Sequence, residues 1–170
     1  MRIRVSGCVN DSIVDGPGIR YTIFTQGCKH DCIGCHNKHT HDLNGGYLID
    51  VDDIIETIKK NPLLDGITIS GGEPFLQAGP CAELARKAKE LNLDVITYTG
   101  YIYEDIIRNE EGKRLLEETD LLVDGPFIEK EKSLSLLYKG SKNQRLINVK
   151  RSLELGKVIE YVMNEYGELE

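Results

Sequence analysis

The chain has 170 residues, 28 of them acidic and 21 basic, which gives a formal net charge of −7. This length allows one domain with a full hydrophobic core, and we expect a single domain over residues 1–170. A closed eight-fold β/α barrel needs about 250 residues, so the chain is too short for one. The acidic balance and the lack of a basic run argue against a nucleic-acid partner.

The cellular compartment expected for the chain decides whether its five cysteines indicate disulfides or metal binding. Residues 1–5 lack the apolar core of a signal peptide, and no run is apolar over the length of a membrane span. We therefore expect a cytoplasmic protein without a membrane partner. Thiols stay reduced in the cytoplasm, so the cysteines, an odd number, indicate metal binding or catalysis rather than disulfides.

The first third of the chain is predicted to contain two strands and a helix. Residues 2–9 are expected to form a short edge strand, and residues 15–18 are a turn by composition. Residues 20–25 are rich in β-branched and aromatic side chains, which is typical of a strand; Arg20, at its start, is interpreted as a solvated charge. Asp50 can cap a helix over 51–60, whose apolar residues recur at helical spacing.

The rest of the chain continues with alternating strands and helices. We expect strands at 67–70, 94–99, 120–124 and 146–149, and helices at 79–91 and 104–118, the second interrupted near 109–112. Residues 153–162 are compatible with a helix or a strand. Because strands and helices alternate, the fold class is predicted to be α/β with a mostly parallel sheet and right-handed crossovers.

The loop after residue 25 concentrates potential metal ligands. Cys28, Cys32 and Cys35 follow the spacing C-x3-C-x2-C, and all four histidines of the chain lie between residues 30 and 41. Thiolates this close in sequence can converge on one metal centre. An iron–sulfur cube held by three thiolates would leave one iron open to a substrate.

Zinc is the competing metal. It prefers a closed tetrahedron, which a fourth ligand from His36, His39 or His41 would complete. The spacing of the cysteines does not choose between zinc and iron. Cys8 and Cys81 are expected to be structural, since a free cysteine in a core behaves as a small hydrophobe.

Three further segments are expected beside the cysteine loop, because ligands bind beyond the carboxyl ends of parallel strands. They are residues 71–74, 97–100 and 124–126. Gly71 and Gly72 let a ligand approach the backbone, and Glu73 can bond an ammonium or hydroxyl group. Without the cysteines, a tight turn would be the preferred interpretation of this segment. A zinc knuckle would not need these segments, whereas a cofactor laid across several strand ends would.

Together these motifs resemble a known family. The spacing of Cys28, Cys32 and Cys35, combined with the sequence GGEP at 71–74, is similar to that of the radical S-adenosylmethionine (SAM) enzymes. The sequence DGPGIR before the cysteines resembles the branch that activates glycyl radical enzymes. The short length and the segments 98–101, 123–127 and 139–145 resemble the activating proteins of anaerobic ribonucleoside-triphosphate reductase. The resemblance covers about residues 5–158.

The resemblance implies an incomplete β/α barrel of the radical SAM type, with one [4Fe–4S] cluster and SAM as cofactors. Cys28, Cys32 and Cys35 would hold three irons, and the amino and carboxylate groups of SAM would chelate the fourth. The residues implied in SAM binding are Gly34, His36, Gly71, Gly72 and Glu73. Weaker candidates are Thr97, Thr99, Asp124, Asn143 and Arg145. Most radical SAM motifs carry an aromatic residue at the position of Gly34, and here His36 is expected to contact the adenine instead.

The resemblance also implies a reaction and its partners. An electron from a low-potential donor such as flavodoxin would enter the cluster and cleave SAM into methionine and a 5′-deoxyadenosyl radical. That radical would remove hydrogen from a backbone glycine in the large subunit of anaerobic ribonucleoside-triphosphate reductase. Two alternatives stay open: a non-catalytic zinc-binding interaction module, and an activase of another glycyl radical enzyme, such as a formate-lyase type.

Overall fold

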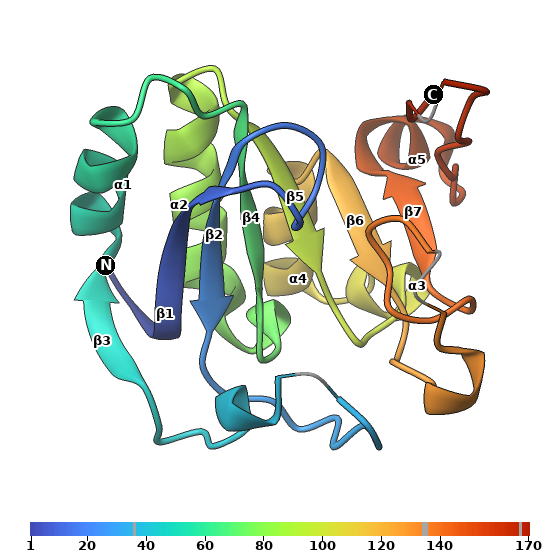
Figure 1. Ribbon diagram of the computed structural model, residues 1–170, viewed down its shortest axis with the longest axis horizontal. Helices are drawn as coiled ribbons and strands as arrows, with labels where there is room; N and C mark the ends of the chain where they lie inside the picture. The colour runs from blue at the N-terminus through green and yellow to red at the C-terminus, as the bar shows by residue number, and fades with distance from the viewer. Residues whose placement is uncertain (36, 134–135, 167) are drawn as a thin grey trace.

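The computed structural model describes residues 1–35, 37–133, 136–166 and 168–170, and the strands of these segments form one sheet (Figure 1). The strands are β1 (Arg2–Ser12), β2 (Arg20–Thr25), β3 (Tyr47–Asp50), β4 (Gly66–Gly71), β5 (Asp94–Tyr98), β6 (Leu121–Asp124) and β7 (Arg145–Asn148). The helices are α1 (Val51–Lys59), α2 (Ala78–Glu90), α3 (Tyr103–Ile106), α4 (Glu110–Glu117) and α5 (Val149–Leu155). Short 3-10 turns lie at Lys38–Thr40, Pro74–Gln77 and Glu129–Glu131.

The sheet has a parallel centre and antiparallel flanks. Its order is β3-β1-β2-β4-β5-β6-β7, and β2, β4, β5 and β6 pair in parallel. This centre confirms the predicted α/β fold with a mostly parallel core. The outer strands β1, β3 and β7 pair antiparallel. In the described part of the chain β3 and β7, the last strands at either end of the order, do not pair with each other, so the barrel stays open.

The prediction that β1 forms an edge strand was wrong. β3 pairs with the outer side of β1 and takes the edge of the sheet itself. Sequence analysis did not find β3 because it has only four residues and runs directly into α1, which leaves no room for a visible alternation of apolar and polar residues.

The two faces of the sheet are covered differently. Helices α1, α2 and α4 lie along one face (Figure 1), where Ile67, Ile69 and Val95 belong to the main core. Ile96 and Val123 point to the other face, where they pack with tyrosines of the later segments. Alternation along the strands therefore produces one face covered by helices and an opposite face covered by later segments of the chain.

Local signals set the helix boundaries where sequence analysis expected them. The Asp50 carboxylate accepts a hydrogen bond from Asp52 N (2.9 Å) and caps α1. The Asn109 side chain caps α4, which confirms the interruption of the predicted helix over 104–118. Gly156, with φ 68°, ends α5, so the ambiguous segment 153–162 is helical at 153–155 and forms no further helix after that. No helix within the described ranges is long and apolar enough to cross a membrane.

Arg20 is fully buried, which corrects its interpretation as a solvated charge. Its guanidinium donates hydrogen bonds to Thr68 Oγ1 (2.8 Å) and to the carbonyl oxygens of Ile67 (2.7 Å) and Pro17 (3.0 Å), and it pairs with the Asp94 carboxylate. The acceptors lie at the amino ends of neighbouring strands and in the turn before β2. The sequence position could not reveal them, because they come together only through sheet pairing.

The turn after β4 packs closely on the segment that leaves β2. Gly72 N donates to Thr25 O (2.8 Å), and Glu73 N donates to Gly27 O (2.7 Å). Gly71 has φ +97°, which side-chain-bearing residues rarely adopt, and a Cβ on Gly72 would overlap the carbonyl oxygen of Gly27. The two glycines therefore allow the ends of two parallel strands to meet.

A pair of glycine substitutions tests this close approach. We expect Gly72→Ala to destabilise the protein by about 1–3 kcal/mol, because the added methyl group must displace the backbone at Gly27. Gly79→Ala is the matched control, since a Cβ there meets nothing within 4 Å and alanine favours the helix that contains it. Urea unfolding measures both changes, and equal stabilities of the two variants would contradict the packing described.

Candidate functional site

The cysteine loop, residues 27–41, brings its three thiols to one cavity. Cys28 N donates to His41 O (3.2 Å), and Cys35 N donates to Cys32 O (3.2 Å), so the loop folds back on itself. Cys28, Cys32 and Cys35 are half-buried free cysteines. All three line a cavity of ≈ 130 Å³ at the carboxyl end of β2.

The donor set consists of three thiols that line one cavity. Among the described residues, no three His, Cys, Asp or Glu side chains form a group that could hold one metal ion. Mononuclear zinc needs its ligands around one point, whereas an iron–sulfur cube offers a separate iron to each thiolate. Cys8 and Cys81 pack with the main core, as predicted. His36 lies outside the described residues, and with it its predicted contacts with zinc or adenine.

The Cys28 thiol lies in an environment that favours its neutral form. Burial raises the pKa of the Cys28 thiol, and the charges of Glu73, Cys32 and Cys35 act in the same direction, while the backbone N–H of His30 opposes them. Cys28 is therefore protonated at neutral pH before metal binds. Metal binding has to release this proton, because the thiolate is the ligand.

The other walls of the cavity come from the segments predicted to gather there. Gly71 ends β4 and Gly72 follows it, Thr99 and Gly100 follow β5, and Gly125 follows β6. The parallel pairing of these strands with β2 places their carboxyl ends at one edge of the sheet. The cavity therefore lies where a ligand-binding crevice is expected in an open parallel sheet.

The role of Gly71 and Gly72 differs in part from the one that the sequence predicts. Gly71 and Gly72 do line the cavity, but the space that their side chains would fill is occupied by the backbone of residues 24–27. Their first role is thus to dock the cysteine loop on the end of β4. A glycine in the sequence shows that another group can pack closely against the backbone there. It does not show whether that group is a ligand or another segment of the chain.

Glu73 lies behind the cavity wall, with 1% of its surface exposed. The Thr99 hydroxyl is 2.9 and 2.8 Å from its two carboxylate oxygens, and the N–H groups of Gly100 (2.8 Å) and Phe75 (3.1 Å) donate to it. His30 Nε2 is 2.5 Å from Oε1. The carboxylate therefore joins the cysteine loop to the ends of β4 and β5.

Of the weaker candidates, Thr99 borders the cavity and the other four have partners elsewhere. Thr97 is buried and bonded to another threonine hydroxyl. Asp124, fully buried, pairs with Arg145 (2.6 Å), and Asn143 Nδ2 donates to a backbone carbonyl (2.7 Å). As contacts of SAM, these residues stay predictions.

Gly34 is also placed away from the cavity lining. It has φ +75°, and a Cβ there would come within 2.7 Å of the Glu129 carboxyl carbon. The left-handed backbone conformation at this position favours glycine, which agrees with the absence of the usual aromatic residue. Its contact with SAM stays a prediction.

Sequence analysis missed other residues of the cavity. His30, Tyr98, Phe127 and Gln144 all line it. The position of His30 between two of the cysteines was the available signal for that residue. Gln144 lies in the segment 139–145, which carries part of the family resemblance. In that segment the sequence predicts Asn143 and Arg145, the residues on either side of Gln144, as contacts of SAM.

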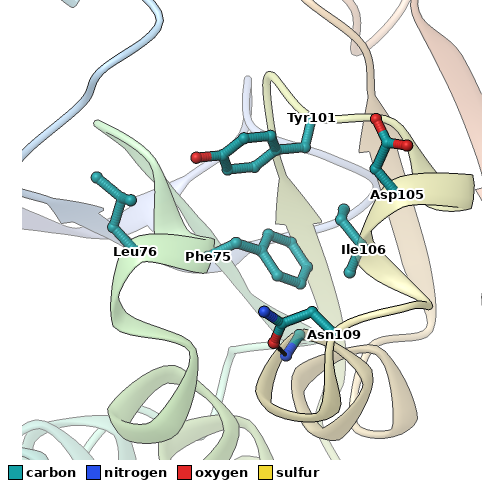
Figure 2. Close-up of a pocket in the computed structure, with 7 residues that line it drawn as sticks. Phe75, Leu76, Tyr101, Asp105, Ile106 and Asn109 are labelled. Carbon is teal, nitrogen blue, oxygen red and sulfur yellow. Dashed lines mark hydrogen bonds between the residues drawn. The ribbon is translucent and has the colours of Figure 1, made fainter.

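A second cavity, of ≈ 350 Å³, is lined by Tyr101, whose ring packs against His30 of this site. Figure 2 shows Tyr101, Phe75 and Ile106 around it. Tyr101 also packs edge-on against His30, with ring centroids 4.5 Å apart. The ring of Tyr101 therefore contacts the cysteine loop and lines the adjacent cavity.

Comparisons with known proteins agree with this geometry. The model of a family described as "4Fe-4S single cluster domain" matches residues 14–147. The anaerobic ribonucleoside-triphosphate reductase-activating protein of Haemophilus influenzae is 32% identical over 142 residues, which cover 78% of this chain and 89% of that protein. The pyruvate formate-lyase-activating enzyme of Staphylococcus epidermidis is 34% identical over 149 residues, which cover 82% of this chain and 59% of that enzyme.

Among solved structures, QueE from Escherichia coli matches 73% of this chain and 70% of its own, with a TM-score of 0.49 and 14% identity. That likeness is too distant to bear on the assignment, which rests on the family model and the sequence relatives. The chain belongs to the 4Fe-4S single cluster domain family and, within it, to the anaerobic ribonucleoside-triphosphate reductase-activating proteins.

Proposed function

We propose that this chain is a radical SAM activating enzyme that generates a glycyl radical on the large subunit of an anaerobic ribonucleoside-triphosphate reductase. The observation that carries the proposal is the meeting of three free thiols with the carboxyl ends of three parallel strands around one cavity. Family membership supports the cluster, and the names of the relatives support the partner.

When bound, the cluster and SAM supply the one-electron cleavage that makes a radical able to take hydrogen from glycine. The chain supplies binding and placement. Cys28, Cys32 and Cys35 would hold three irons, and the turn at Gly71 and Gly72 would support the methionine end of SAM. The Thr99 hydroxyl, on the cavity wall, bonds Glu73 and so keeps that carboxylate in place.

The open sheet suits a macromolecular substrate. Since β3 and β7 do not pair with each other in the described structure, the sheet does not close into a barrel around the site. A backbone glycine reaches such a site only when a partner protein presents it, and the partner then shields the radical from water. We propose a low-potential protein such as flavodoxin as the electron donor, as the family resemblance implies.

The two alternatives are supported less well. A zinc module would need a mononuclear ligand group, and the described residues contain none. An activase of a formate-lyase type is favoured by one relative of 34% identity, but that match extends over 59% of the relative, against 89% for the reductase activator. The formate-lyase type of activase and the reductase activase would differ in the partner protein that receives the radical.

The first prediction of this proposal concerns the cluster. After anaerobic reconstitution, we expect about four irons and four sulfides per chain and a brown colour. Cys28→Ala, Cys32→Ala or Cys35→Ala should each abolish the cluster, whereas Cys81→Ala, in the core, should retain it. Iron and sulfide analysis with visible absorption measures this, and stoichiometric zinc without colour in protein prepared free of air would refute it.

The second prediction concerns the product. Mixed anaerobically with the reductase, SAM and a reductant, the protein should produce a stable radical on the reductase chain. We expect an EPR doublet that collapses to a singlet when the reductase is made with glycine deuterated at Cα, because the doublet arises from that hydrogen. The Cys32→Ala variant is the negative control. Rapid SAM cleavage that leaves the reductase without a radical would exclude the proposed function.

A further inference from the structure

The imidazole of His30, between Cys28 and Cys32 in the sequence, lies in a close-fitting socket beside the cavity. The socket consists of Glu73, Gly100 and Tyr101. His30 Nε2 is 2.5 Å from Glu73 Oε1, and the Tyr101 ring meets the imidazole edge-on. A Cβ on Gly100 would come within 2.7–2.9 Å of three atoms of the imidazole ring. Glycine at position 100 therefore leaves the space that the imidazole occupies.

The carboxylate in this socket has no free acceptor site. Glu73 Oε1 accepts hydrogen bonds from Thr99 Oγ1, Gly100 N and His30 Nε2. Its Oε2 accepts from the same Thr99 hydroxyl and from Phe75 N. A carboxylate offers about four lone-pair sites, so a further donor must replace one of these. Two donors are backbone groups and one is a buried hydroxyl on the same turn. His30, 17% exposed, is the donor that can leave without moving a strand.

The position of the cavity adds an independent observation. His30, Thr99 and Gly100 line it, but Glu73 does not, so these three residues stand between the cavity and the carboxylate. The cavity of ≈ 130 Å³ is also smaller than the roughly 300–1,000 Å³ usual for a small-molecule site. A ligand with an amino group can reach Glu73, and gain volume, by displacing the imidazole.

We propose that His30 is a displaceable latch, a positioning residue that holds the cysteine loop on Glu73 until an N–H of the amino group of SAM takes its place. This inference rests on the proposed function and assigns a role to His30 within that site. Binding of SAM then breaks one hydrogen bond of the cysteine loop, so the contacts of the loop with the ends of β4 and β5 change when the ligand arrives. The wild-type affinity for SAM is correspondingly lower than that of a protein without the latch.

Substitutions of different reach test the latch in the cluster-loaded protein. His30→Gln keeps an N–H donor near the position of Nε2, whereas His30→Asn is too short to reach Glu73 and His30→Ala has no donor. We expect His30→Asn and His30→Ala to bind SAM about tenfold more tightly than wild type, and His30→Gln to bind within about twofold of it. Equilibrium dialysis with labelled SAM gives the dissociation constants, and iron content is measured on each sample.

His39→Ala is the control, because the exposed His39 side chain is in the same loop, while its recorded hydrogen bond uses the backbone carbonyl. Unchanged or weaker SAM binding by fully loaded His30→Asn and His30→Ala would overturn the latch. Loss of the cluster in these two variants, with retention in His30→Gln, would also overturn it, since the contact would then serve cluster binding. A fully loaded wild type that binds no SAM would instead refute the proposed function itself.

Discussion

The close approach of the cysteine loop to the end of β4 is the constraint on which the site depends. The hydrogen bond from Glu73 N to Gly27 O fixes the start of the loop on the glycine turn. This bond can form because glycine at position 72 leaves room for the carbonyl of Gly27. Three thiols on an irregular loop thereby gain a defined position relative to a rigid sheet, which is the arrangement that a cofactor site requires.

The two ends of the parallel strands divide stability and chemistry between them. At the amino ends, the buried Arg20 satisfies its donors with Thr68, Pro17, Ile67 and Asp94, and so joins a turn to neighbouring strands. At the carboxyl ends, the corresponding polar residue is Glu73, which joins three loops. Both are charged groups with filled hydrogen-bonding capacity, and the described residues contain no buried side-chain nitrogen or oxygen without a partner.

Sequence analysis succeeded where the signal is local. The cysteine spacing, the cap at Asp50 and the break before α4 depend on residues within a few positions of one another. It failed where the partner lies far along the chain. The acceptors of Arg20 come from β4 and β5, and the contact of His30 with Glu73 exists only because β2, β4 and β5 pair in one register. Spacing therefore indicated the three thiols that line one cavity, but not the residue that connects their loop to the rest of the site.

The sparse backbone bonding of the cysteine loop has a consequence for how iron could enter. In the described part of this loop, the backbone bonds of its cysteines are Cys28 N to His41 O and Cys35 N to Cys32 O, in contrast to the continuous ladder of β2 with β4. Opening such a segment costs less than unfolding the sheet. The loop is therefore the unit whose amide hydrogens should exchange with solvent first, and iron and sulfide can be inserted through this local opening while the sheet stays folded.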